Sequence, residues 1–190
     1  MDVKVLRFPA NVDDWDLVVD FLRLRTDVFV GELGWSLPTH RGLEFEQYDS
    51  FQNVVYVLAI EGGSVVAGGR LVRTDARQPG GSYTYMIKDA HEGRLPGMPA
   101  QLCFEAPPTD PDIWELTRIA APRSRVGAKR VCEGVNDFLK GQGAKYCLGL
   151  GAPSLMKLMG VFGYRPQPIG WLTSNHDGSF LAFQCEVRYD

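Results

Sequence analysis

Two apolar, strand-like segments of this chain carry charged residues, and this feature limits the folds that the chain can adopt. Residues 65–73 include Arg70, and residues 113–121 include Glu115 and Arg118. A charge inside an apolar strand costs free energy unless a partner of opposite sign lies beside it. We therefore expect a fold that supplies such partners to each of these side chains.

Glu115 and Arg118 stand three residues apart in Trp114-Glu115-Leu116-Thr117-Arg118. In a regular strand, side chains three residues apart point to opposite faces of the sheet. The two side chains can share one site only if a bulge or a bend interrupts the strand. The sequence does not decide between a bulge and a bend.

Hydrophobic periodicity predicts the remaining elements. Strands are expected at 3–8, 54–60, 65–73, 113–121, 146–150, 164–169 and 180–187. Helices are expected at 15–29, 127–140 and 154–162. This order predicts an α/β (α+β) fold with three layers, an α/β/α sandwich around a mixed sheet, in a single domain that spans residues 1–190.

Composition excludes several classes of function. The net charge of -3, from 20 basic and 23 acidic side chains, argues against nucleic acid as a partner. The four cysteines lack metal-ligand spacing, so we expect reduced thiols and no metal. The N-terminus has no signal-peptide pattern and the apolar runs are too short for a membrane span. We therefore expect a cytoplasmic protein without a membrane partner.

Two further clusters qualify as parts of a ligand site. Arg25 and Phe29 lie four residues apart on one helix face, and Trp35 follows. A cation beside aromatic rings suits a ligand with a carboxylate, a sulfonium and a flat base, although ordinary amphipathic packing explains the same spacing. Glu46 and Asp49 belong to an acidic segment, 43–49, which is equally typical of a solvated loop.

The candidate site residues include three cations and three anions, a balance that suits a zwitterionic substrate. They are Arg25, Arg70, Arg118, Glu46, Asp49 and Glu115. The residues that carry this pattern, in chain order, are Arg25, Phe29, Trp35, Glu44-Phe45-Glu46-Gln47-Tyr48-Asp49, Arg70-Leu71 and Trp114-Glu115-Leu116-Thr117-Arg118. This series resembles the signature of the autoinducer synthase family, the acyl-homoserine-lactone synthases of bacterial quorum sensing. The chain departs from it at Glu46, where Asp is commonest, at Thr117, where Ser is common, and at Ile119, where Phe is frequent.

The resemblance implies a fold similar to that of N-acyltransferases (GNAT-like), with a splayed mixed sheet. It implies transfer of an acyl group from acyl-CoA or acyl carrier protein to the amine of S-adenosylmethionine. The methionine carboxylate then closes the lactone and methylthioadenosine leaves. Both reactants are substrates, so no cofactor is expected.

The resemblance also implies roles for individual residues. Glu115 is the candidate general base, acting directly or through a water. The catalytic set is Glu115, Arg118, Glu46, Asp49 and Arg70. The residues expected to bind S-adenosylmethionine are Arg25, Phe29, Trp35 and Asp49.

The acyl donor has two expected contacts. Arg123, Arg125 and Gly127 open a helix, where a phosphopantetheine phosphate fits, although a solvated basic helix start is an equal alternative. The apolar candidates for the acyl pocket are Leu148, Leu150, Met156, Met159 and Phe162. The strand at 148–151 lacks a hydroxyl, which favours an unsubstituted, branched or aryl acyl group.

Two rival functions remain open. One is a different N-acyltransferase of the same fold, which acylates another amine from acetyl-coenzyme A. The other is a signal-binding module that has lost turnover. Release of methylthioadenosine separates the three, because only the synthase makes it.

Overall fold

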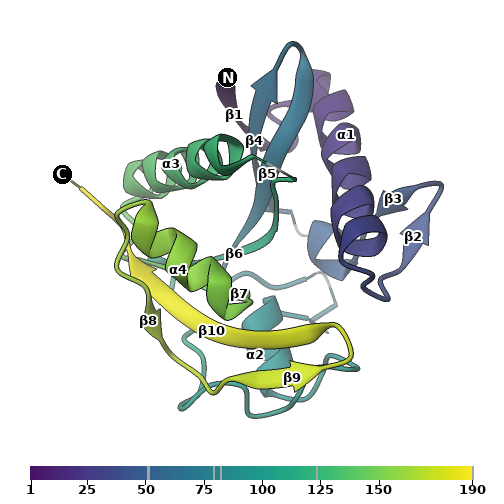
Figure 1. The fold of residues 1–190 in the computed structure, drawn as a ribbon. Helices are drawn as coiled ribbons and strands as arrows, with labels where there is room; N and C mark the ends of the chain where they lie inside the picture. Colours follow the sequence, from purple (N-terminus) through teal and green to yellow (C-terminus); the bar gives the residue numbers. More distant parts are fainter. Residues whose placement is uncertain (51, 79, 82, 123, 190) are drawn as a thin grey trace.

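The structure is a computed structural model that describes residues 1–50, 52–78, 80–81, 83–122 and 124–189. Most strands join one mixed sheet, and helices lie against both of its faces (Figure 1). The sheet strands are β1 (Asp2–Arg7), β4 (Val55–Glu61), β5 (Ser64–Arg73), β6 (Ile113–Ala120), β7 (Tyr146–Gly151), β8 (Gln167–Pro168), β9 (Thr173–Asn175) and β10 (Gly178–Glu186). Their order across the sheet is β1-β4-β5-β6-β7-β10-β8, and β9 pairs with β10.

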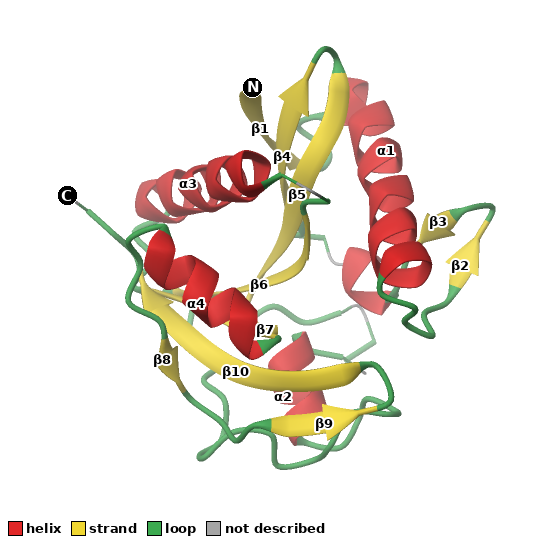
Figure 2. Cartoon of the chain, viewed as in Figure 1, coloured by secondary structure: helices red, strands yellow, loops and turns green. Residues whose placement is uncertain are grey.

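The helices form the two outer layers, as Figure 2 shows in red. The α-helices are α1 (Trp15–Arg25), α2 (Met86–His91), α3 (Arg125–Gly141) and α4 (Pro153–Val161). Side chains of α1 and α2 share one apolar core, and those of α3 and α4 pack against the opposite face. This arrangement confirms the three-layer α/β/α sandwich.

Shorter elements connect these layers. They are the 3-10 turns η1 (Val12–Asp14) and η3 (Gln47–Ser50), the π-helix η2 (Thr26–Glu32), and the small hairpin of β2 (Thr39–His40) and β3 (Leu43–Glu44). The π-helix η2 continues α1 directly, and its wider turns are held by bonds such as Leu33 N to Val28 O at 2.9 Å. Such wide turns often occur at functional sites.

Strand β4 illustrates how the sequence builds a central strand. Val55, Val57 and Ala59 face the core beneath α3, whereas Tyr56 and Leu58 face the core beneath α1. A strand covered on both faces needs an almost continuous apolar run rather than strict alternation. The run from Val54 to Ile60 meets this need.

The sheet splays open between its two parallel strands. β6 and β7 pair from Ile113 with Tyr146 to Leu116 with Gly149, and no further pairs follow. β6 nevertheless continues beside β5, and β7 continues beside β10 as far as Gly151. The ends of β6 and β7 therefore diverge, which confirms the splayed mixed sheet.

A β-bulge interrupts β6 at Arg118, one of the two residues for which the sequence left a bulge or a bend open. The pairing with β5 shifts from Gly68 opposite Ala120 to Arg70 opposite Thr117, so β6 carries one extra residue. Arg118 lies in this bulge with a φ of 53°, in the left-handed region that a side chain seldom adopts. A bulge, and not a bend alone, therefore redirects Arg118.

Two predictions about secondary structure were wrong. The strand expected at 164–169 contains only the two-residue β8, because Pro166 and Pro168 have no N–H group for a ladder. The helix α2, with only six residues, was not predicted. Its N-terminus depends on a contact with β6 that is remote in sequence, as described below.

Candidate active site

Three arginines and three carboxylates form one neutral cluster between α1, β3, η3, β5 and β6. The arginines are Arg25, Arg70 and Arg118, and the carboxylates are Glu44, Glu46 and Asp49. We call this set the charged cluster. Its charges balance, as the sequence predicted, but Glu44 takes the place that had been expected for Glu115.

Arg25 is the inner cation of the charged cluster. Its Nε donates to Glu44 Oε2 at 2.5 Å, and its two Nη atoms donate to the two oxygens of Asp49 at 2.7 and 3.0 Å. The side chain has 0% exposure. Arg25 therefore holds the acidic segment against α1, and its side chain lies behind the residues that line the cavities.

Arg70 is the second buried cation. Its Nη2 donates to Glu46 Oε1 at 2.6 Å, its Nη1 lies 3.0 Å from Asp49 Oδ2, and its Nε donates to Thr117 Oγ1 at 3.2 Å. Burial disfavours the charged guanidinium, but Asp49 and Glu46 outweigh it and raise the pKa of Arg70. Arg70 therefore stays charged and orients both carboxylates.

Burial and neighbouring charges also act in opposite directions on the pKa values of Asp49 and Glu46. Burial raises the pKa of Asp49, but Arg70 and Arg25 lower it by more, and the net pKa lies below the ordinary value. Burial also raises the pKa of Glu46, but Arg70 and Arg118 lower it by more, so its net pKa likewise lies below the ordinary value. Both side chains are anionic at neutral pH.

A local turn prepares the acidic segment for these contacts. The 3-10 turn η3 lets Asp49 Oδ2 accept the N–H of Glu46 at 3.0 Å. Tyr56 Oη, from the neighbouring strand β4, donates to Asp49 Oδ1 at 3.0 Å. Asp49 is thus surrounded by donors, and it serves to build the site rather than to face a ligand.

One ion pair of the charged cluster reaches a cavity. Arg118 Nη2 donates to Glu46 Oε2 at 2.7 Å, and the two side chains are 9% and 10% exposed. They line a cavity of about 260 Å³, which we call the charged cavity. Its other walls include Trp35, Met86, Leu150 and Phe180.

Trp35, an aromatic wall of the charged cavity, belongs to a stacked pair. The rings of Phe29 and Trp35 lie 5.0 Å apart and nearly parallel, and Trp35 also meets Phe180 edge to face. The π-helix η2 makes this contact possible because it brings the N–H of Trp35 to 2.8 Å from the carbonyl of Phe29. The stack also supports Arg118, whose guanidinium lies 5.7 Å from the centre of the Phe29 ring.

A second cavity lies in the opening between β6 and β7. It has a volume of about 220 Å³, and we call it the splay cavity. Leu116, Thr117 and Ile119 line it from β6, and Gly151 and Ala152 line it from the end of β7. Four residues line both this cavity and the charged cavity, namely Trp35, Met86, Arg118 and Leu150. The two cavities therefore adjoin.

Glu115 lies beneath α2 and lines neither cavity. Its two oxygens accept the N–H groups of Met86 and Ile87 at 2.9 and 2.6 Å, at the N-terminus of α2. Burial raises the pKa of Glu115 to about 7, in spite of these two bonds and of nearby Arg70. Glu115 therefore positions Met86, which lines both cavities.

The expected phosphate site is only partly described. Arg123 lies outside the described residues, and Arg125 is the exposed first residue of α3. The N–H of Gly127 donates to the capping Ser124 Oγ at 2.9 Å. A Cβ on Gly127 would lie 3.1 Å from that of Ala67, so the glycine lets α3 approach β5 closely.

The five residues expected to form an acyl pocket do not line one cavity. Leu150 lines the charged and splay cavities, while Leu148 and Met159 line a third cavity beneath α3 and α4. Phe162 lines a polar hollow at the surface, and Met156 packs against the core of α4. Residues three apart on a helix turn by about 60° relative to one another, so the α4 residues spread over its surface.

Sequence reasoning missed several residues that support the site. Glu44 is fully buried and pairs with Arg25 and Arg118, although its neighbours Glu46 and Asp49 were selected. Asp89 is also fully buried; it accepts bonds from Tyr48 and Thr84 and pairs with Arg94. Glu44 could have been selected from the sequence, because it lies in the acidic segment. The sequence offered no reason to select Asp89, because no motif surrounds that residue.

Two classes of site find no support in the described part of the chain. Its His, Cys, Asp and Glu side chains form no group of three or more that is arranged to hold a metal. None of its helices is both long enough and apolar enough to cross a bilayer.

Comparison with solved structures defines the class of fold. The chain matches TofI in a ternary complex with an inhibitor and MTA (TM-score 0.78, 22% identity, 98% of this chain and 92% of that one). It also matches BjaI, a CoA-dependent acyl-homoserine lactone synthase with SAM and isopentyl-CoA (TM-score 0.79, 24% identity, 98% of this chain and 83% of that one). A putative N-acetyltransferase from Lactobacillus plantarum matches less well (0.61, 12%, 98% and 98%). The fold is thus that of GNAT-like acyltransferases.

Sequence comparison then defines the family. A family model described as autoinducer synthase matches residues 12–131. An acyl-homoserine-lactone synthase from Ralstonia solanacearum is 33% identical over 177 residues, 86% of this chain and 78% of that protein. An isovaleryl-homoserine lactone synthase from Bradyrhizobium diazoefficiens is 29% identical over 88% of this chain and 64% of that protein. The chain belongs to the autoinducer synthase family, and it is an acyltransferase of the acyl-homoserine-lactone synthase class.

Proposed function

We propose that this enzyme binds S-adenosylmethionine in the charged cavity and an acyl thioester in the splay cavity. The observation that carries the proposal is the ion pair of Glu46 and Arg118 at the wall between the two cavities. A zwitterionic amino acid needs an anion for its ammonium group and a cation for its carboxylate. Glu46 and Arg118 offer both, beside the aromatic faces of Trp35 and Phe29.

Acyl transfer then requires that the amine of S-adenosylmethionine reaches the thioester carbonyl. The amine nitrogen attacks the thioester carbonyl, the carbon–sulfur bond breaks, and the thiol leaves with a proton. Because Trp35, Met86, Arg118 and Leu150 line both cavities, the amine and the carbonyl approach each other at that shared wall. Positioning of this kind accounts for much of the rate of a bimolecular reaction.

Glu115 is the proposed proton acceptor, acting through a water. A carboxyl with a pKa of about 7 takes up a proton readily at neutral pH. Glu115 lines neither cavity, and this supports a proton transfer through a water rather than a direct one.

Lactone closure completes the proposed reaction. A carboxylate oxygen of the acylated S-adenosylmethionine attacks its own γ-carbon, the bond from that carbon to the sulfonium breaks, and methylthioadenosine leaves as a neutral thioether. No redox step occurs, and both reactants are substrates rather than cofactors. Arg118 would hold the carboxylate for this attack.

The acyl donor, its phosphate site and the cellular compartment are assigned less precisely than the site for S-adenosylmethionine. The donor is an acyl thioester of coenzyme A or of acyl carrier protein, with the phosphopantetheine phosphate near Arg125 and Gly127 at the start of α3. We place the whole reaction in one domain, residues 1–190, and in the cytoplasm.

A donor panel tests the proposal. The purified protein is incubated with S-adenosylmethionine and acyl thioesters of coenzyme A and acyl carrier protein, and products are identified by mass spectrometry. Acyl-homoserine lactone together with methylthioadenosine supports the proposal. Thiol release with another amine, without methylthioadenosine, indicates a different N-acyltransferase. Binding of S-adenosylmethionine without turnover on any donor indicates a binding module.

A further inference from the structure

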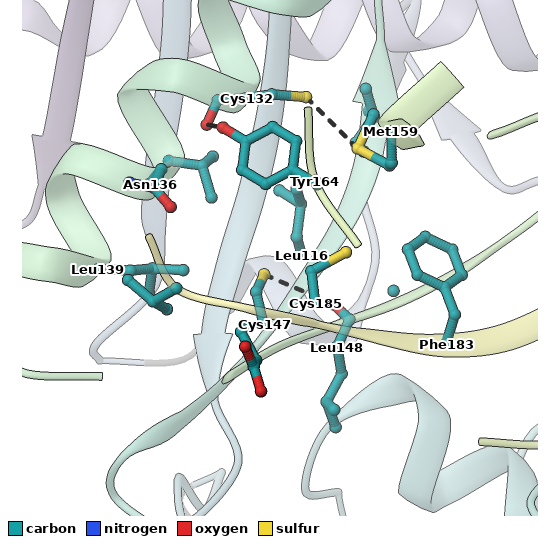
Figure 3. A pocket seen from close by; sticks show the side chains of 15 residues that line it. Leu116, Cys132, Asn136, Leu139, Cys147, Leu148, Met159, Tyr164, Phe183 and Cys185 are labelled. Carbon is teal, nitrogen blue, oxygen red and sulfur yellow. Dashed lines mark hydrogen bonds between the residues drawn. The ribbon is translucent and has the colours of Figure 1, made fainter. Parts of the chain in front are cut away.

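A third cavity lies on the face of the sheet that α3 and α4 cover, beyond the splay cavity (Figure 3). Its volume is about 40 Å³, and we call it the terminal cavity. Apolar side chains and thiols dominate its lining, among them Leu116, Cys132, Leu139, Cys147, Met159 and Phe183. An uncharged, apolar group is the only ligand chemistry that suits such walls.

The polar side chains that line the terminal cavity are Tyr164, Asn136 and Glu186, and Glu186 is exposed at the end of β10. Tyr164 Oη donates to the carbonyl of Cys132 at 2.9 Å, and Asn136 exchanges bonds with the backbone of Arg188. Burial raises the pKa of the Cys132 thiol to about 12 and that of the Cys185 thiol to about 11. The thiols are therefore neutral at physiological pH and behave as small apolar groups.

The terminal cavity adjoins the splay cavity. Leu116 and Ile119, both on β6, line the two cavities from either side. A chain that enters between the diverging ends of β6 and β7 therefore reaches the terminal cavity by passing these two side chains. The carbonyl stays at the wall shared with the charged cavity, and the far end of the chain points towards α3 and α4.

Phe183 stands where this path enters the terminal cavity, because the pairing of β6 with β7 ends at Gly149. It stands on β10 directly opposite Gly149 of β7, and it is 5% exposed. A Cβ on Gly149 would lie 2.7 Å from Cζ of Phe183, which shows that the tip of the ring occupies the space that a side chain at position 149 would fill. The ring also packs in one core with Met159 of α4. Phe183 thus fills space that a longer chain would need.

We propose that Phe183, seated on Gly149, sets the maximum length of the acyl group and makes the enzyme selective for short straight or branched acyl thioesters. This inference rests on the proposed function and deepens it. Since roughly 10–15 Å³ of such space holds one water-sized group, the terminal cavity accommodates about three such groups. A chain that needs more room has to displace the Phe183 ring, which lines this cavity.

The test compares Phe183→Ala with the unaltered enzyme on donors of increasing chain length. The unaltered enzyme is expected to show its highest kcat/KM on short donors. The variant is expected to shift its preference by about tenfold or more towards longer donors, since each added methylene in a pocket changes kcat/KM by at least that factor. Calorimetric binding of the same thioesters gives a second readout that does not need turnover.

Phe138→Ala is the matched control, because it removes an equal ring from α3 outside all three cavities. It is expected to keep the original length preference. Gly149→Ala provides a change in the opposite direction: the added methyl pushes the ring into the terminal cavity, and the longest accepted donors should be lost. Phe183→Leu repeats the test with a smaller change if the alanine variant does not fold.

Outcomes distinguish this inference from the proposed function. If lactone and methylthioadenosine form but Phe183→Ala or Phe183→Leu keeps the original length preference, the role of Phe183 is wrong and the function stands. A preference of the unaltered enzyme for long donors would also show that the role of Phe183 is wrong while the function stands. If no donor gives both products, the proposed function itself fails.

Discussion

Glu46 and Arg118 are the one ion pair in the described part of the charged cluster in which both partners reach a cavity. Glu46 Oε2 lies 2.7 Å from Arg118 Nη2, and each side chain is about a tenth exposed. Arg25, Glu44, Asp49 and Arg70 have fully buried side chains behind this pair. The cluster thus has an inner part that holds the fold and an outer part that meets the ligand.

Glu46→Gln is expected to weaken binding of S-adenosylmethionine. The variant keeps the shape but loses the charge that attracts the ammonium group, and a charge-assisted bond contributes about 1.5–3 kcal/mol. Calorimetry should show a Kd about tenfold or more above that of the unaltered enzyme, with thioester binding unchanged. Glu61→Gln, at the exposed end of β4, is the control. An unaltered Kd in Glu46→Gln would remove this residue from the ammonium site.

Arg25→Met is expected to lower stability rather than to act on the ligand directly. Removing the guanidinium takes one of two cationic partners from each of the buried carboxylates Glu44 and Asp49, which costs about 3–5 kcal/mol. Urea unfolding measures the loss. Arg23→Met, on the exposed side of the same helix, should change stability by about 0.5 kcal/mol or less. Equal stability of the two variants would contradict the scaffold role of Arg25.

Glu115→Gln is expected to slow acylation and to alter its pH dependence. The amide still accepts one N–H bond from α2 but takes up no proton at neutral pH. The rate should fall by about 10²-fold or more, and the acid limb near pH 7 in the kcat/KM profile should disappear. A slow variant that keeps this acid limb would indicate that Glu115 only positions α2. A near-normal rate would exclude both roles.

Acid should unfold the protein through the charged cluster. The pKa of Asp49 lies below its ordinary 3.8, and that of Glu46 below 4.5, so the folded state resists their protonation. Their contribution to stability is fully present above these values and is lost as the pH falls below them. Glu115 acts in the opposite sense, because its contribution declines as the pH rises towards about 7.

The measurement is the free energy of unfolding as a function of pH. It should fall steeply below about pH 4. Asp49→Asn should reduce that slope, whatever its effect on overall stability, because the amide binds no proton. An unchanged slope would show that Asp49 does not link folding to acid.

The sequence predicted those parts of the site that depend on charge in apolar segments. Arg70 and Arg118 stood out because a strand seldom carries an unpaired cation, and both proved to be paired. The spacing of Arg118 to Glu115 left a bulge or a bend open; the structure has the bulge, but Glu115 faces α2 instead of the charged cluster.

Other parts depended on contacts that a single sequence does not encode locally. Helix α2 is too short for a periodic pattern, and its N-terminus relies on Glu115, which lies 28 and 29 residues away from its two bond donors. The expected acyl residues are spread over several cavities, because apolar spacing does not say which side of a helix faces a cavity. Phe183 gave no signal, since its importance comes from the absence of a side chain at Gly149 on the neighbouring strand.

The most direct test of the central claim is the stoichiometry of the products during one time course. The unaltered enzyme, S-adenosylmethionine and the best acyl thioester are mixed, and free thiol, methylthioadenosine and acyl-homoserine lactone are quantified together. The account predicts that one thiol and one methylthioadenosine accumulate for each lactone. Thiol release without methylthioadenosine would contradict it, because the two cavities would then serve an acyl transfer that ends at the amide.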